Sequence, residues 1–140
     1  MSSHKITQYG AIAWRRSGTG VEILLITSRE TQRWVVPRGN VIRGLAPHLS
    51  AAQEAFEEAG IRGHADPEAI GVYRYKKRLR LGRIVPAEVH LFPLEVSEEL
   101  EEWPERHQRQ RRWFSPSEAA EAVAEPELKA LILAMSRNSR

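Results

Sequence analysis

A short segment bounded by Pro47 and Gly60 constrains the fold more than any other part of the sequence. Proline suits the first turn of a helix, where its missing N–H is not needed, and glycine suits a left-handed helix end. On a helical wheel at about 100° per residue, small apolar side chains gather on one side and three carboxylates on the other. The apolar side comprises Leu49, Ala52, Ala55, Phe56 and Ala59, and the acidic side comprises Glu54, Glu57 and Glu58. We therefore predict a helix over 47–59 that packs closely on a sheet and presents a cluster of acids.

The rest of the chain shows alternating strand patterns followed by helical ones. Strands are expected at 9–16, 21–28, 34–37, 70–79, 84–96 and 111–114, and the first two form a hairpin through a turn at 17–20. Helices are expected at 118–123, after Ser115 or Ser117 as N-cap, and at 126–135, with a loop over 38–46. Pro86 and Pro93 favour an edge or bulge over a central ladder for the strand that holds them. This order predicts an α/β fold of the α+β kind, a mixed sheet packed against helices.

Composition narrows the class of protein further. The 140 residues, 41% hydrophobic and 28% charged, suit a single domain over 1–140. With no cysteine, the chain has no disulfide framework, zinc-thiolate site or cysteine nucleophile. Its apolar runs are far shorter than the roughly 20 residues of a membrane span, and 1–10 lacks the apolar core of a signal peptide. We expect a cytoplasmic protein with no membrane partner.

Charge is distributed unevenly along the chain. The 21 basic and 18 acidic residues give a net charge of +3, too mild by itself to indicate nucleic acid. Basic residues cluster over 74–83 and again over 106–112, and an acidic run over 95–105 separates them. Each run is either a solvated surface or, for the basic ones, a binding site for a phosphate-rich ligand.

Three glutamates on one helix face call for a cation among them. Like charges one turn apart repel, and hard oxygen ligands with room for water suit Mg²⁺ or Mn²⁺ better than zinc. Taken alone, the cluster Glu54, Glu57 and Glu58 is more typical of an ordinary solvated helix face than of a metal site.

The longer context of this helix resembles the signature of the Nudix hydrolases. Gly39, followed after thirteen residues by Gln53 and the run 54–61, is similar to the box G-x5-E-x7-R-E-U-x-E-E-x-G-U, in which U is apolar. Two positions depart from it, since Leu45 stands in place of Glu and Gln53 in place of Arg. Both replacements are neutral, so neither leaves the other charge unpaired, and we expect activity to survive with altered metal affinity.

Further segments resemble the diphosphoinositol polyphosphate phosphohydrolase branch of that family. They are 24–29, 33–37, 54–60 and 109–114. The resemblance implies a mixed β-sheet sandwiched between α-helices. It also implies a small phosphorylated substrate, such as a diphosphoinositol polyphosphate or a dinucleoside polyphosphate, hydrolysed at a diphosphate linkage with Mg²⁺ or Mn²⁺ as cofactor.

The resemblance also suggests roles for individual residues. Glu54 and Glu58 correspond to metal ligands and Glu57 to the proton acceptor, although other members of the family use the position of Glu54 as base. The backbone near Gly39 is a further candidate metal ligand, because glycine permits a close approach. Substrate contacts are implied for Ser28, Arg29, Arg78 and Arg109, and charge and position add Arg38, Arg43, Lys77 and Arg111.

Two other functions stay open at this point. Leu45 and Gln53 are compatible with a module that binds a polyphosphate without cleaving it. The basic stretch over 74–83, with Tyr73 and Tyr75 beside it, is compatible with RNA-end binding, although the mild net charge makes nucleic acid the less favoured partner. The sequence does not determine the oligomeric state.

Overall fold

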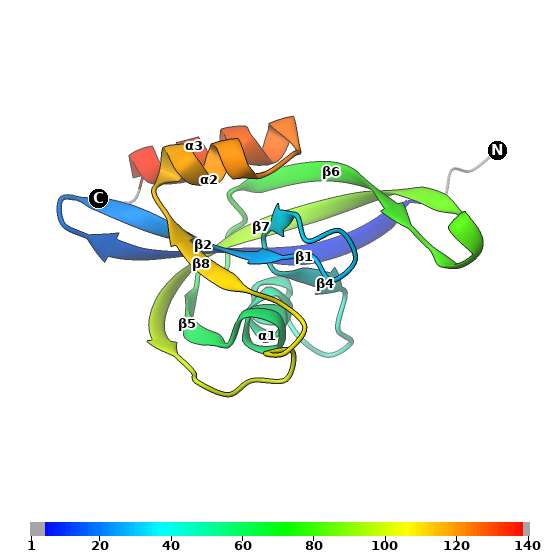
Figure 1. Ribbon diagram of the computed structural model, residues 1–140, viewed down its shortest axis with the longest axis horizontal. Helices are drawn as coiled ribbons and strands as arrows, with labels where there is room; N and C mark the ends of the chain where they lie inside the picture. The colour runs from blue at the N-terminus through cyan, green and yellow to red at the C-terminus, as the bar shows by residue number, and fades with distance from the viewer. Residues whose placement is uncertain (1–4, 139–140) are drawn as a thin grey trace.

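A computed structural model describes residues 5–138 and shows a single mixed sheet with helices on both faces (Figure 1). The eight strands are β1 (Ile6–Ser17), β2 (Gly20–Thr27), β3 (Trp34–Val35), β4 (Arg38–Asn40), β5 (Ile61–Ala65), β6 (Gly71–Arg78), β7 (Ile84–Glu99) and β8 (Arg111–Phe114). The helices are α1 (Pro47–Ala59), α2 (Pro116–Ala122) and α3 (Pro126–Asn138), with a short 3-10 turn η1 (Arg80–Gly82). In this part of the chain, no helix is both long and apolar enough to cross a membrane.

Strands β1 and β7 form the centre of the sheet and run parallel to each other. The main path is β3-β2-β1-β7-β5, while β4 pairs with β1, β6 with β7 and β8 with β2. All of these other pairs are antiparallel, so the sheet is mixed as expected. The β1–β2 and β6–β7 hairpins project beyond the helical layers at opposite ends of the molecule (Figure 1).

The two faces of the sheet carry separate hydrophobic cores. Helices α2 and α3 cover one face through a cluster that includes Ile12, Leu25, Leu128 and Ile132. Helix α1 covers the other face through a second cluster, built around its alanines. The predicted sandwich of a mixed sheet between helices is confirmed.

Helix α1 begins and ends where the proline and the glycine at its two ends predicted. Pro47 occupies its first turn, and Gly60 adopts φ +68° while its N–H donates to the carbonyl oxygen of Phe56. Ala51, Ala55 and Ala59 are fully buried, which lets the helix lie close against the sheet. Leu49 departs from the prediction, since it is 47% exposed. The rise per turn places Ser50, not Leu49, against the loop before the helix, where its hydroxyl accepts the N–H of Ile42.

Three other expectations about strands need correction. Residues 38–40 are a strand, not a loop, because they pair with 8–10 of β1. Residues 61–65 form β5, which the sequence analysis missed. Only the first and last residues of β5 are buried, so the sequence shows no apolar alternation over this strand. The proline-containing strand β7 is central from Ala87 onward, whereas Pro86, just before the β1 ladder, pairs only with β6 among the described residues. Pro93 is tolerated there because its second neighbour changes from β6 to β5 at this point, so no ladder needs its missing N–H.

Candidate active site

The most buried carboxylate of the acidic cluster is that of Glu58, at the C-terminal end of α1. One of its oxygens accepts the backbone N–H of Arg38 at 3.2 Å, and the other lies 3.6 Å from a guanidinium nitrogen of Arg109. Burial raises the pKa of Glu58 to about 8, although the positive charge of Arg109 acts in the opposite direction. The positive charge of Arg109 therefore does not fully compensate the cost of burying a charged Glu58 carboxylate.

Glu54 lies one turn earlier on the same face and against strand β4. Gly39 approaches its carboxyl group so closely that a Cβ atom at this position would overlap it. The approach is fixed by the pairing of Gly39 with Tyr9 of β1, the central strand on which α1 packs. Burial and the neighbouring Glu57 raise the pKa of Glu54, and a hydrogen bond with Glu58 partly offsets them. Glycine is required here by the space that the carboxyl group occupies.

Glu57 points to a partner within its own helix. Its carboxylate accepts a hydrogen bond of 2.8 Å from the side-chain amide of Gln53, one turn earlier. This contact gives Gln53, one of the two departures from the Nudix box, a definite position in the site. Leu45, the other departure, is partly exposed in the loop before α1.

The donor set fits a hard divalent cation held by few protein ligands. Glu54 and Glu58 bring two half-buried or buried carboxyl groups together, both with raised pKa values. Within the described residues, however, no three Asp, Glu or His side chains are arranged as a metal site, and Glu57 is hydrogen-bonded to Gln53. Mg²⁺ and Mn²⁺ suit such a pair, since these ions commonly keep several waters and take the rest of their ligands from one or two carboxylates and from substrate phosphates.

A cleft of about 480 Å³ opens beside this pair of carboxylates. Gly39 and Glu58, from the predicted metal-binding group, line it. All five residues predicted to bind substrate line it as well: Ser28, Arg29, Arg38, Arg78 and Arg109. Lys77, added from charge alone, also lines it, together with Arg33 and Lys76. Glu54 and Glu57, on the same helix as Glu58, are not among the residues that line it. The structure thus brings residues from five separate segments to one basic cleft.

The cations of the cleft are held by the fold rather than left loose. Arg109 donates to Glu105 at 2.8 Å and to the carbonyl oxygen of Thr27 at 3.1 Å, so its guanidinium stays beside Glu58. Arg29 donates to the side chain of Gln108 at 3.1 Å. The turn that carries Arg29 is closed by Ser28, whose hydroxyl accepts the N–H of Arg33. Anchored guanidinium groups lose less entropy when they bind a phosphate.

Arg38 belongs to an aromatic network beneath the cleft that the sequence analysis did not find. Its guanidinium lies 4.0 Å from the centre of the Tyr75 ring and donates to the hydroxyl of Tyr73 at 3.1 Å. Tyr75 in turn donates to the side chain of Gln8 at 2.7 Å. Burial raises the pKa of Tyr73 to about 12, so this phenol stays neutral. The alternation of Tyr73 and Tyr75 along β6 was visible in the sequence, but their shared partner Arg38 lies 35 residues away.

Two of the cations added from charge alone do not reach the cleft. Arg111 donates to the carbonyl oxygens of Ala59, Gly60 and Leu100, and its guanidinium stacks on Trp103. It therefore caps the C-terminal end of α1. Arg43 is exposed in the loop before α1 and does not line the cleft.

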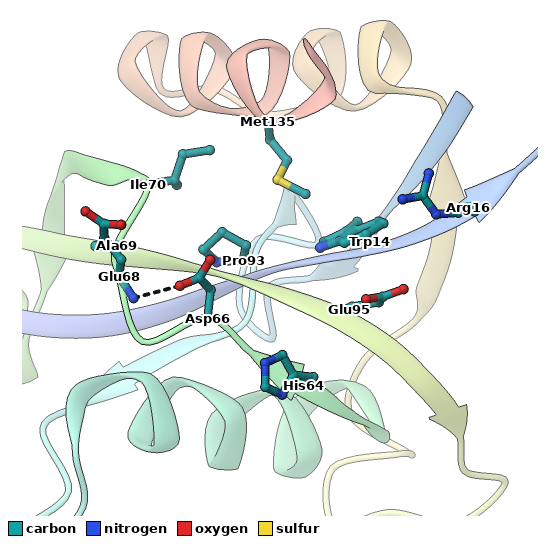
Figure 2. Close-up of a pocket in the computed structure, with 10 residues that line it drawn as sticks. All are labelled: Trp14, Arg16, His64, Asp66, Glu68, Ala69, Ile70, Pro93, Glu95 and Met135. Atoms are coloured by element: carbon teal, nitrogen blue, oxygen red, sulfur yellow. Dashed lines mark hydrogen bonds between the residues drawn. The ribbon is translucent and has the colours of Figure 1, made fainter. Parts of the chain in front are cut away.

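A second cavity, of about 470 Å³, lies under α3 (Figure 2). Figure 2 shows Trp14 and Met135 on its upper side and His64 and Asp66 below. None of the predicted site residues lines it, and its charged side chains are mostly acidic. The basic cleft beside Glu58 is therefore the better candidate for binding a phosphorylated ligand.

Comparisons with known proteins agree with this fold. A family model described as NUDIX domain matches residues 6–134. The chain therefore belongs to the Nudix family, as the resemblance of its central helix implied.

Individual relatives of this chain are named as hydrolases of this family. It is 34% identical over 108 residues to Nudix hydrolase 21, chloroplastic, of Arabidopsis thaliana, covering 76% of this chain and 52% of that protein. It is 31% identical over 111 residues to diphosphoinositol polyphosphate phosphohydrolase 2 of Rattus norvegicus, covering 77% and 58%. The chain thus spans about half the length of the curated relatives it matches. Several of these relatives have chloroplastic or mitochondrial names, so the cytoplasmic location stays a prediction.

Solved structures share the fold at low sequence identity. The Ap4A hydrolase of C. elegans has a TM-score of 0.68 at 18% identity, covering 96% of this chain and 98% of that one. The NUDIX domain of Shewanella oneidensis NrtR, complexed with ADP ribose, has a TM-score of 0.69 at 10% identity, covering 97% and 90%.

Proposed function

We propose that this protein is a Mg²⁺- or Mn²⁺-dependent hydrolase that cleaves a diphosphate linkage in a highly phosphorylated small molecule. One observation carries the proposal. The carboxyl groups of Glu54 and Glu58 both have raised pKa values, and Glu58 lines a cleft together with seven basic side chains. A cation at the carboxylates and anionic phosphates in the cleft would balance both sets of charges.

In this proposal the residues of α1 and β4 divide the chemistry. Glu54 and Glu58, with the backbone at Gly39, hold the divalent ion. When bound, the ion neutralises phosphate charge and lowers the pKa of water. Glu57 accepts the proton of the attacking water, and Gln53 orients its carboxylate through the hydrogen bond of 2.8 Å. The guanidinium groups of the cleft, above all that of Arg109, bind the phosphates and hold them in line.

The lining of the cleft favours a diphosphoinositol polyphosphate over a dinucleoside polyphosphate. Seven of its residues are basic and two are acidic. The basic residues are Arg29, Arg33, Arg38, Lys76, Lys77, Arg78 and Arg109, and the acidic residues are Glu30 and Glu58. The only aromatic residue among those lining it is Tyr75, and the Arg38 guanidinium covers its ring. A site for many phosphates with no free ring for a base suits an inositol polyphosphate. The similarity to the rat phosphohydrolase points the same way.

A module that binds the same ligand without hydrolysis is the second candidate. The observation that favours it is the hydrogen bond between Gln53 and Glu57, which occupies an oxygen of the proposed base. RNA-end binding has lost its main support, because Tyr73 is fully buried and the ring of Tyr75 is covered.

A phosphate-release screen distinguishes these functions. The chain is assayed with Mg²⁺ or Mn²⁺ against diphosphoinositol polyphosphates, dinucleoside polyphosphates, ADP-ribose and nucleoside triphosphates. We expect turnover of a diphosphoinositol polyphosphate that falls by about 100-fold or more in Glu57→Gln. Glu101→Gln, which alters an exposed carboxylate outside the cleft, is the matched control and should keep its rate. Ligand binding without turnover in the folded parent would instead identify the binding module.

A further inference from the structure

The tip of the β6–β7 hairpin carries a patch that the hydrolase proposal does not use. We call residues 80–84 the basic tip; it comprises the 3-10 turn η1 and the start of β7. Figure 1 shows this hairpin extending away from the helical layers at one end of the molecule. The strand leading to it, at Lys76, Lys77 and Arg78, lines the cleft, but the tip itself does not.

The cations at and before the tip have no acidic partners. The segment 76–84 holds five basic residues and no acidic one. In the part of the chain that the structure describes, none of the five makes a side-chain hydrogen bond or ion pair with a carboxylate. They are Lys76, Lys77, Arg78, Arg80 and Arg83. By contrast, arginines beside the acidic run are paired, as in the contacts of Arg62 with Glu98 and of Arg109 with Glu105. Removing these five from the 21 basic residues leaves 16 against 18 acidic ones, so this hairpin carries the excess positive charge of the chain.

Two apolar side chains stand exposed among these cations. Leu81 at the apex is fully exposed, and Ile84 is 52% exposed. Leu81 also adopts φ +63°, a left-handed conformation that glycine or asparagine adopts more readily than leucine. Neither packing nor backbone conformation accounts for a leucine here. An apolar environment outside the protein, into which Leu81 could insert, would account for the exposed leucine.

The combination of exposed apolar and unpaired basic side chains fits a lipid surface better than other anionic partners. Phosphates of RNA would pair with the cations but would leave Leu81 in water, and no aromatic residue in 76–84 is present to stack on bases. A second copy of the same tip would bring like charges together. Anionic phospholipids offer phosphates to the cations and an apolar layer just below them.

We propose that the basic tip docks the protein onto the surface of an anionic phospholipid bilayer. Leu81 and Ile84 enter the interfacial layer, while Arg80 and Arg83 contact lipid headgroups. The expectation of no membrane partner was based on the lack of a spanning segment, and peripheral docking does not need one. The proposal is independent of hydrolysis, because binding to vesicles is measured without substrate.

Vesicle sedimentation with the whole chain tests the proposal. We expect binding to vesicles of phosphatidylcholine with 30% phosphatidylserine, at least tenfold weaker binding to phosphatidylcholine alone, and weakening by salt. Each basic residue near an anionic surface contributes about a fivefold gain in binding, so Arg80→Ser with Arg83→Ser should lose about 25-fold. Leu81→Ser should lose about five- to tenfold. Leu133→Ser and Arg62→Ser, at exposed positions on other elements, are the matched controls and should bind as the parent does.

A fluorescent label at the tip separates lipid insertion from mere charge attraction. Because the chain has no cysteine, Leu81→Cys creates a single labelling site, and Leu133→Cys provides the control. An environment-sensitive dye at position 81 should shift to shorter wavelength on the anionic vesicles, and the dye at position 133 should not. The proposal is overturned if the anionic vesicles do not bind, if binding is unchanged in Leu81→Ser, or if single-stranded RNA binds while vesicles do not. A shift at position 81 that grows with protein concentration alone would identify a second copy as the partner and would also overturn it.

Discussion

At the scale of single residues, Gly39 determines where the carboxyl group of Glu54 can lie. A methyl group on residue 39 would overlap that carboxyl group, which is the movable end of a flexible side chain. We therefore expect Gly39→Ala to displace Glu54 with little loss of stability, and to lower kcat/KM by about 10- to 100-fold, since misplacing a catalytic group by about 1 Å costs that much. Gly20→Ala, where a methyl group would enter open space, is the matched control for steady-state kinetics and thermal unfolding. An unchanged kcat/KM in Gly39→Ala would show that the position of Glu54 does not matter.

A second residue, Tyr73, connects stability to pH. Burial raises the pKa of Tyr73 to about 12, whereas an unfolded tyrosine titrates near 10. The unfolded state therefore loses its proton first as the pH rises, so this residue's contribution to stability is complete below pH 10 and declines between pH 10 and 12. The decline amounts to about 3 kcal/mol.

The variant Tyr73→Phe should lack this alkaline decline. It should also be destabilised by about 1–2 kcal/mol at pH 7, because the Arg38 guanidinium loses its 3.1 Å acceptor. Urea unfolding at pH 7 and at intervals between pH 9 and 11 measures both effects. Tyr9→Phe serves as the control, because its hydroxyl makes no hydrogen bond with the described residues. Equal pH slopes in the parent and Tyr73→Phe would contradict the prediction.

At the scale of elements, the end of α1 that bears the proposed catalytic glutamates is clamped by the segment after β7. Trp103 donates its indole N–H to the carbonyl oxygen of Glu58, and the N–H of Glu105 donates to that of Glu57. Arg111 donates to the carbonyl oxygens of Ala59 and Gly60, where a positive charge also complements the helix dipole. These contacts fix the last turn of α1.

Loss of this clamp should affect both stability and metal binding. Arg111→Met leaves three carbonyl oxygens without their charged donor, so we expect a destabilisation of about 2–3 kcal/mol. Metal affinity should fall as well, because Glu58 lies on the loosened turn. Arg112→Met, on the neighbouring exposed residue of the same strand, should change stability by less than 1 kcal/mol. Thermal unfolding with and without Mg²⁺ compares the two variants, and a similar loss in both would argue against the clamp.

Elements with strong local signals could be predicted from the sequence, and those that depend on pairing could not. Pro47, Gly60 and the alanines defined α1, and the capping box of Ser115 with Glu118 begins α2 as expected. Strand β4 is only three residues long and exists because β1 is available beside it. The central place of β7 likewise depends on partners, since local rules assigned Pro93 to an edge. Leu49 was placed on the buried face by periodicity, but the sheet covers only a narrow strip of α1, occupied by its alanines.

At the scale of the whole molecule, the structure separates positive and negative charge into different regions. The acidic run over 95–105 spans the end of β7 and the segment after it, and is largely paired with arginines, as in Arg15 with Glu99 and Arg106 with Glu102. The cations of the β6–β7 hairpin have no acidic partners among the described residues, and three of them, Lys76, Lys77 and Arg78, line the cleft. Sequence analysis predicted the members of the cleft from a family resemblance and from charge. Charge alone did not distinguish Lys77, which lines the cleft, from Arg111, which caps a helix, because the difference lies in which carbonyl groups the fold brings near.

This separation of charge predicts how substrate binding depends on salt. With seven basic and two acidic residues lining the cleft, attraction of a polyphosphate is largely electrostatic and is screened beyond about 10 Å at 0.1 M salt. Raising KCl from 0.05 to 0.5 M at fixed Mg²⁺ should increase KM for a diphosphoinositol polyphosphate about tenfold, while kcat changes by less than about twofold because Arg109 and Glu58 are buried from the salt. ADP-ribose, with only two phosphates, should show a much smaller rise in KM if it is turned over, and Arg78→Ser should reduce the slope for the polyphosphate. Equal salt dependence of KM for the two substrates would mean that binding does not depend on the number of phosphates. The preference for inositol polyphosphates would then come from the shape of the ligand rather than from its charge.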